Sequence, residues 1–225
     1  MNWTMRKYSL LSKFIVLFLS GFIISCNQTN EKTSRVSELP YYNEATFTPL
    51  WNKGNSGEEN ELHSIPSFSL TNQDGETVTE KTFEDKIYVT NFFFTTCPGI
   101  CPKMTANLSV LQEEFLEDDE ILLLSHSATP EIDSVEVLKS YAEKNNVISG
   151  KWHLVTGNRN EIYELGRNQY FVEEDLSRDK TDDEFLHTEN FVLVDKNKHI
   201  RGIYNGLNKT AVAQLIADIK TLKTE

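Results

Sequence analysis

Hydrophobic and polar positions alternate in blocks between residues 62 and 222, and the blocks predict strands and helices in turn. Short apolar runs rich in β-branched and aromatic residues predict strands at residues 87–94, 121–124, 152–155 and 191–194. Apolar residues spaced three to four apart predict helices at residues 102–116, 134–145, 160–165 and 208–222. Polar turns at residues 72–75 and 195–198 predict two hairpins, one joining 68–70 to 77–79 and one joining 191–194 to 200–204. This order predicts an α/β domain with a mixed central sheet and helices on both faces.

The first 25 residues have the pattern of an export signal. Arg6, Lys7 and Lys13 are basic, and the apolar run at residues 14–24 is shorter than the roughly 20 residues needed to span a bilayer. The end of this run, Ile-Ile-Ser-Cys, resembles a bacterial lipoprotein cleavage box, which implies that Cys26 is diacylated and becomes the mature N-terminus. The alternative is an ordinary secretory signal or an uncleaved anchor, with Cys26 incidental.

Composition divides the chain into three parts. Residues 1–25 are the predicted lipoprotein signal peptide, residues 26–61 a tether with an extended N-terminal segment, and residues 62–225 the folded domain. Within the second part, the aromatic stretch 39–51 is expected to pack on the domain as extended chain. The expected location is the cell envelope, with a lipid anchor in the membrane and the domain facing the periplasm, an oxidising compartment.

The formal net charge of −12 restricts the choice of partner. A surface this acidic argues against nucleic acid and against anionic lipid as ligands, since both attract positive patches. Part of the charge lies in residues 170–184, which read as an acidic, irregular insertion. Solubility is the simplest explanation of the remaining charge.

Two cysteines, Cys97 and Cys101, directly follow the predicted strand 87–94, at the point where the next helix begins. A thiol at a helix N-terminus is stabilised as the thiolate by the helix dipole and the free N–H groups. Pro98 and Pro102 restrict this loop and suit a helix start. Such a pair can close a disulfide or bind a soft metal such as Cu(I), zinc or an iron–sulfur cluster. Three intervening residues, rather than two, make the metal clip more plausible.

A third ligand is expected from His187, which lies just ahead of the predicted strand 191–194. Imidazole suits copper and zinc. A cysteine pair beside a strand–helix–strand unit is typical of the thioredoxin-like fold. Thioredoxins carry a cis-proline in the loop equivalent to that of His187, whereas this chain has no proline after Pro130. His63 and His126 stay open as candidates, His153 is expected in a strand, His199 at a turn and Met104 in the core.

The sequence FFFTTCPGICPKM at residues 92–104, with His187 ahead of Phe-Val-Leu-Val-Asp, resembles the Sco/SenC family. The resemblance covers residues 62–222 and implies a thioredoxin-like fold with an N-terminal extension. It also implies that Cys97, Cys101 and His187 bind copper, as Cu(I), Cu(II) or both. Members help to assemble the dinuclear copper centre of cytochrome c oxidase. The implied partners are the copper-receiving oxidase subunit, a thiol reductant protein and the membrane.

Two alternatives and one departure accompany this resemblance. The chain can instead act as a thiol–disulfide reductase on the oxidase cysteines, which needs only Cys97 and Cys101. A peroxiredoxin-like peroxidase ranks low, because Phe94 occupies the position where that chemistry uses a Thr. Many family members carry Asp-Pro-x-x-Asp after the second strand, whereas here the first Asp is Thr129 and the second is Asp133. No role of that first Asp can be carried over.

Overall fold

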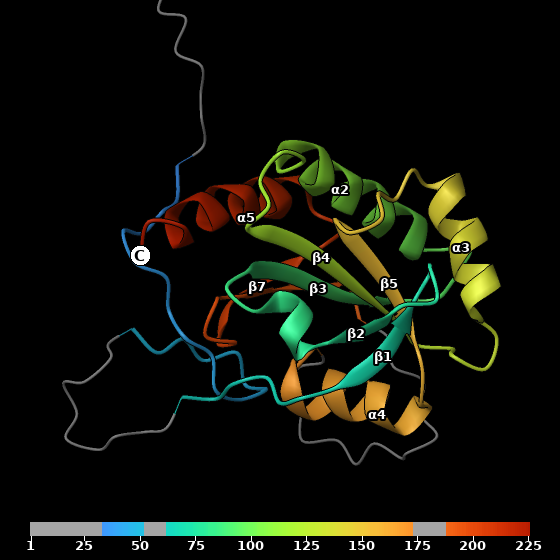
Figure 1. Cartoon of the computed structure of the whole chain (residues 1–225). Helices are drawn as coiled ribbons and strands as arrows, with labels where there is room; N and C mark the ends of the chain where they lie inside the picture. Colours follow the sequence, from blue (N-terminus) through green and yellow to red (C-terminus); the bar gives the residue numbers. More distant parts are fainter. Residues whose placement is uncertain (1–32, 52–61, 173–187) are drawn as a thin grey trace, which may run out of the picture. The chain divides into compact units, whose positions relative to one another are not determined.

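The computed structural model describes residues 33–51, 62–172 and 188–225. The predicted lipidation site Cys26, the predicted ligand His187 and most of the acidic insertion lie outside these ranges. A seven-stranded sheet with the strand order β2-β1-β5-β4-β3-β6-β7 forms the centre of the described domain (Figure 1). The strands are β1 Ser69–Asn72, β2 Thr77–Thr79, β3 Ile87–Phe93, β4 Ile121–Ser127, β5 Trp152–Thr156, β6 Asn190–Val194 and β7 Ile200–Asn205.

Strand pairing follows the predicted connections. β3, β4 and β5 are parallel neighbours, because helices carry the chain from the end of one strand to the start of the next. β6 pairs antiparallel with β3, and the two predicted hairpins, β1–β2 and β6–β7, are both present. The prediction of an α/β domain with a mixed sheet is therefore confirmed.

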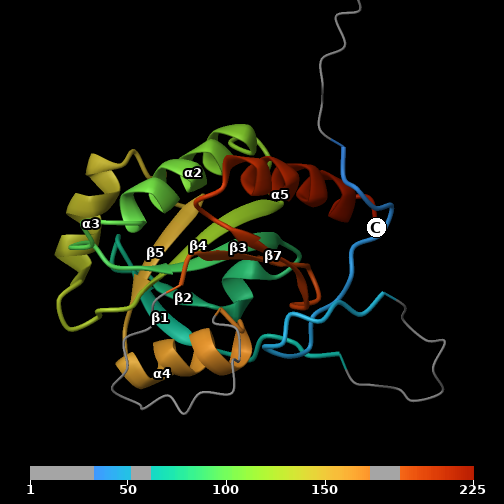
Figure 2. The same cartoon turned by 180° about the vertical axis from the view of Figure 1, so that it is seen from behind.

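Helices cover both faces of this sheet. α2 and α5 lie on one face and α4 on the other, as the two opposite views agree (Figures 1 and 2). Ser134, Asn158 and Asn208 cap α3, α4 and α5 with side-chain oxygens that accept backbone N–H groups. The helical elements are the 3₁₀ turn η1 Glu80–Phe83, α2 Cys101–Glu114, α3 Val135–Lys144, α4 Arg159–Glu164, the π-turn η2 Leu165–Gln169 and α5 Lys209–Leu222.

The sheet separates two apolar cores. The first, which we call face A, includes Val89, Phe93, Cys101 and Leu108 under α2 and α5. The second, face B, includes Phe92, Leu124 and Tyr170 on the side of α4. Successive residues of a strand point to opposite faces, so neighbours such as Phe92 and Phe93 belong to different cores.

The N-terminal segment packs on the domain as expected. Tyr41 and Leu50 exchange backbone hydrogen bonds of 2.9 Å, and the Tyr42 N–H donates to the Ile200 carbonyl at 3.0 Å. The buried Arg201 donates to the Leu39 carbonyl at 2.6 Å and the Pro40 carbonyl at 3.1 Å. The segment thereby covers the edge strand β7, whose backbone groups would otherwise be open to pairing.

Some boundaries differ from the predicted ones. β4 continues to Ser127, past the expected end at residue 124, because the polar residues Ser125, His126 and Ser127 are buried within the sheet. α2 begins at Cys101 rather than at residue 102 or 103. None of the helices in the described ranges is both long enough and apolar enough to cross a membrane.

Candidate metal centre

The two cysteines lie where β3 ends and α2 begins. Cys101 is the first residue of α2 and is 4 % exposed, while Cys97 lies in the preceding turn and is half-buried. The Cys97 N–H donates to the Phe94 carbonyl at 3.3 Å, which closes the turn after the strand. Both thiols are free, and each is within interaction distance of the other. The predicted juxtaposition of the two sulfurs is therefore present.

The two thiols differ in their surroundings. Partial burial opposes ionisation of Cys97, but the N–H groups of Cys101, Gly99 and Ile100 and the Cys101 thiol hydrogen-bond to it, so its pKa falls below the usual value. Burial raises the pKa of Cys101 to about 12, although the Phe94 backbone opposes the shift. Cys97 is thus the accessible, more readily ionised sulfur, because N–H groups of the turn and of the first residue of α2 hydrogen-bond to it.

A buried carboxylate, Asp133, joins the elements around this turn. Thr95 donates to it twice, from Oγ1 to Oδ1 at 2.5 Å and from its N–H to Oδ2 at 3.3 Å. Ser127, the last residue of β4, donates to Oδ2 at 2.6 Å, and Thr129 donates to the same oxygen at 3.1 Å. The sequence signalled Asp133 only as the second Asp of a motif, because its donors come from other segments.

The expected third ligand, His187, lies outside the described residues, but the chain next to it is described. Val172 and Thr188 bracket the undescribed segment, and the Thr188 hydroxyl donates to the Val172 carbonyl at 2.6 Å. Thr188 leads directly into β6, which pairs with β3, the strand that ends at the cysteine turn. Among the described residues, no three His, Cys, Asp or Glu side chains gather as a metal site.

The other candidate residues do not join the thiols. His126, on β4, is fully buried on face B, where it stacks on Phe92 with ring centroids 4.6 Å apart. His153 is a strand residue of β5 as expected, and Met104 is fully buried in the core. His199, beside the β6–β7 turn, is within 2.9 Å of the His63 carbonyl. The sheet therefore separates His126 from the cysteines.

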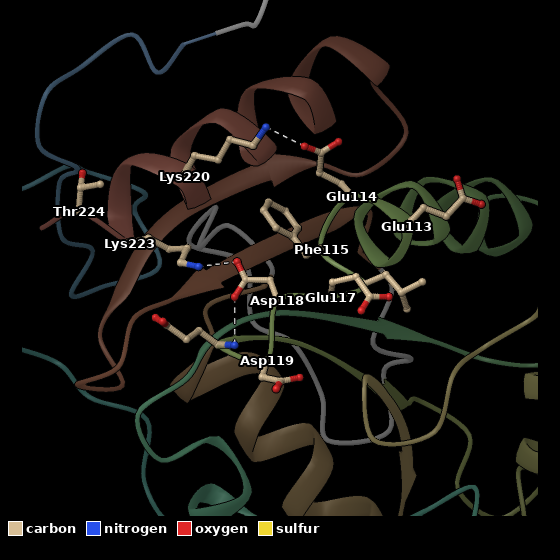
Figure 3. Close-up of a pocket in the computed structure, with 11 residues that line it drawn as sticks. Glu113, Glu114, Phe115, Glu117, Asp118, Asp119, Lys220, Lys223 and Thr224 are labelled. Atoms are coloured by element: carbon tan, nitrogen blue, oxygen red, sulfur yellow. Dashed lines mark hydrogen bonds and ion pairs between the residues drawn. The ribbon is translucent and has the colours of Figure 1, made fainter.

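A hollow of about 900 Å³ lies at the far end of α2 from Cys101 (Figure 3). Acidic residues dominate its lining, and the two lysines that border it are engaged: Lys220 binds Glu114 at 2.7 Å and Lys223 binds Asp118. The helix is 14 residues long, so its two ends are about 20 Å apart. This hollow is thus separate from the thiol pair.

Comparison with known proteins points to one family. The SCO1/SenC family model matches residues 56–224. A SCO1/SenC family lipoprotein from Bacillus anthracis is 30% identical, with a TM-score of 0.63 over 72% of this chain and 96% of that one. BsSco, of the Sco family of cytochrome c oxidase assembly proteins, is 27% identical, with a TM-score of 0.61 over 74% of this chain and 97% of that one. Arabidopsis thaliana ScoI, solved with copper bound, is 25% identical, with a TM-score of 0.55 over 72% and 99%.

Proposed function

Because the chain belongs to the SCO1/SenC family, we propose that it is a copper-binding metallochaperone that helps to mature the dinuclear copper centre of cytochrome c oxidase. The observation that carries the proposal is the pair of free thiols, Cys97 and Cys101, side by side at the junction of β3 and α2. Two soft sulfur donors fit Cu(I) well. Two relatives support it, since ScoI was solved with copper bound and BsSco belongs to a family of oxidase assembly proteins.

His187 completes the donor set in this proposal. It immediately precedes Thr188, and Thr188 leads into β6, the direct neighbour of the strand that ends at the cysteine turn. A residue at that point of the sequence is suitably placed in the chain to approach the two sulfurs. Imidazole added to two thiolates gives a set that accommodates both Cu(I) and Cu(II).

Delivery takes place at the membrane in this proposal. Cys26 carries the lipid, the domain faces the periplasm, and the copper-receiving subunit of the oxidase is the partner. The B. anthracis relative is described as a lipoprotein, which supports the anchor. A thiol reductant protein keeps Cys97 and Cys101 reduced, because thiols in that compartment otherwise oxidise.

Copper titration of the reduced chain from residue 27 onward tests the site. We expect one equivalent of tightly bound Cu(I), and a loss of at least about tenfold in affinity for His187→Ala. His199→Ala is the matched control, since it removes a histidine whose ring contacts the His63 carbonyl rather than the thiols. A reduced wild-type chain that retains no copper would refute the proposal, and equal affinities in all three proteins would remove His187 from the site.

A thiol–disulfide reductase is the second candidate, favoured by the unequal exposure of the two sulfurs. The half-buried Cys97 can attack a disulfide in the oxidase subunit and form a mixed disulfide, while the partner's other sulfur leaves as a thiol. The buried Cys101 then displaces the subunit, so that the subunit gains two thiols and this chain keeps the disulfide. The activity needs no histidine, so a large loss of reductase activity in His187→Ala would count against it.

A further inference from the structure

We propose that Asp133 is the positioning residue of the thiol pair: its buried carboxylate holds the turn that carries Cys97 in place opposite Cys101. The inference rests on the proposed function only where copper is concerned. The arrangement of the two sulfurs can be measured without metal.

The contacts converge from three segments of the chain. Thr95 lies two residues before Cys97, Ser127 ends β4, and Thr129 opens the loop that leads to Asp133 itself. All of them donate to one carboxylate, at 2.5 to 3.3 Å. A single side chain therefore fixes the end of β3, the end of β4 and the following loop relative to one another.

Burial gives these contacts weight. Asp133 is 0 % exposed, and its four donors are neutral hydroxyl and amide groups, with no ion pair to it within the described ranges. Burying a carboxylate without a cation is costly unless its oxygens are well hydrogen-bonded. A neutral or apolar side chain would stabilise the loop without the desolvation cost of a buried carboxylate. Its two contacts with Thr95, two residues before Cys97, instead fit a need for accurate geometry in that turn.

The loop between Ser127 and Asp133 is also fixed through Ala128, which contacts α4 and β3. The Tyr163 hydroxyl of α4 donates to the Ala128 carbonyl at 3.1 Å, and the Ala128 N–H donates to the Phe93 carbonyl at 2.7 Å. The loop is therefore attached to the sheet at one end, while Asp133 attaches its other end to Thr95. Removing the Asp133 contacts therefore loosens the Cys97 turn, while the Ala128 contacts still attach the loop to β3 and α4.

Three variants separate positioning from stability. Thr95→Val removes the Thr95 hydroxyl and keeps almost the same side-chain shape. Asp133→Ala removes all four hydrogen bonds to the carboxylate. Asp133→Asn is the conservative rescue, because its amide oxygen can still accept from Thr129, Ser127 and the Thr95 N–H, while the Thr95 hydroxyl turns to accept from the amide nitrogen. Asp218→Ala is the matched control: Asp218 is a buried carboxylate that accepts from Tyr204 and Gln214, both at 2.8 Å, away from the thiols.

The first readout is the equilibrium of the metal-free chain with glutathione. Two thiols become a disulfide as one oxidised glutathione is split into two reduced molecules, so the constant reports how well the two sulfurs face each other. We expect at least about a threefold shift towards the dithiol in Thr95→Val and Asp133→Ala, with Asp133→Asn close to wild type. Asp218→Ala should lower the melting temperature and leave this constant unchanged.

The second readout is Cu(I) affinity by competition with a chelator. We expect a loss of about tenfold in Thr95→Val and Asp133→Ala, as for other groups that orient metal ligands, and none in Asp218→Ala. If Thr95→Val and the folded Asp133 variants match wild type in both readouts, Asp133 has no positioning role. If the wild-type chain binds no copper, the proposed function fails, while the glutathione constants still decide the role of Asp133.

Discussion

Both faces of the central sheet bury side chains capable of binding a metal, Cys101 on face A and His126 on face B, but the surroundings of these side chains differ. On face A, buried Cys101 lies beside the half-buried Cys97, and polar side chains connect to one another: Trp152 Nε1 donates to Ser125 at 2.8 Å, and Ser125 donates to Asn91 at 2.5 Å. On face B, His126 is buried among aromatic rings, with Thr90 as the partner of Nδ1 and none for Nε2 in the described part of the chain. A buried residue of a metal-binding type therefore does not by itself form a metal site. Access and neighbouring donors distinguish the cysteines from His126.

Copper affinity should show the largest difference between substitutions on the two faces. Cys97→Ser replaces a soft thiolate with a hydroxyl, so we expect at least about a 100-fold loss of Cu(I) affinity. His126→Leu should bind copper as tightly as the wild type, because its ring lies on the other side of the sheet. Competition titration of both variants checks the difference. A loss of copper in His126→Leu, in a variant that still melts cooperatively, would contradict the separation of the two faces.

The hydrogen-bonded side chains of Trp152, Ser125 and Asn91 on face A should contribute to the free energy of unfolding. Ser125→Ala leaves both the Trp152 indole N–H and the Asn91 side-chain amide oxygen without their partner, and each buried unpaired group costs about 1–3 kcal/mol, so we expect a loss of about 2–6 kcal/mol. Urea unfolding measures it. Tyr170→Phe on face B removes one hydroxyl of the 3.1 Å Tyr88–Tyr170 contact and should cost about 1 kcal/mol. Equal losses in the two variants would show that the two hydrogen bonds of Ser125 contribute no more than the single Tyr88–Tyr170 contact.

The pH dependence of stability should come from face B. Burial lowers the pKa of His126 to about 3, whereas in the unfolded chain it returns towards 6.5. Between these values the unfolded chain binds more protons, so stability falls as the pH is lowered from 6.5, by up to about 1.4 kcal/mol per pH unit. His126→Leu should remove this slope. Urea unfolding of both proteins at pH 7, 6 and 5 checks it, and a wild-type-minus-variant difference independent of pH would rule it out.

The smallest effect is expected at the acidic hollow beside the C-terminal end of α2 (Figure 3). Lys220→Ala breaks an ion pair with Glu114 between two half-exposed side chains, and such pairs contribute about 0–1 kcal/mol. Copper affinity should stay within experimental error, because the pair lies at the far end of α2. A measurable change in copper binding would indicate that the two ends of the helix are coupled.

The fold was largely predictable because each element satisfies its own periodicity. The hairpins, the helix after the cysteines and the terminal helix appear close to their predicted bounds. The end of β4 was predicted too early, since Ser125, His126 and Ser127 interrupt the apolar run and yet are buried. Their burial depends on Asn91, Thr90 and Asp133, which lie in other segments and leave no local signal.

The sequence by itself determined which side chains can do chemistry here: two cysteines at a strand–helix junction, and their spacing along the chain. Only the tertiary structure decided that Cys97 is accessible while Cys101 is buried, that His126 faces away from both, and that Asp133 joins Thr95, Ser127 and Thr129. The reason is physical. Periodicity is a property of neighbours along the chain, whereas a hydrogen-bonded cluster needs donors that only strand register and loop closure bring together.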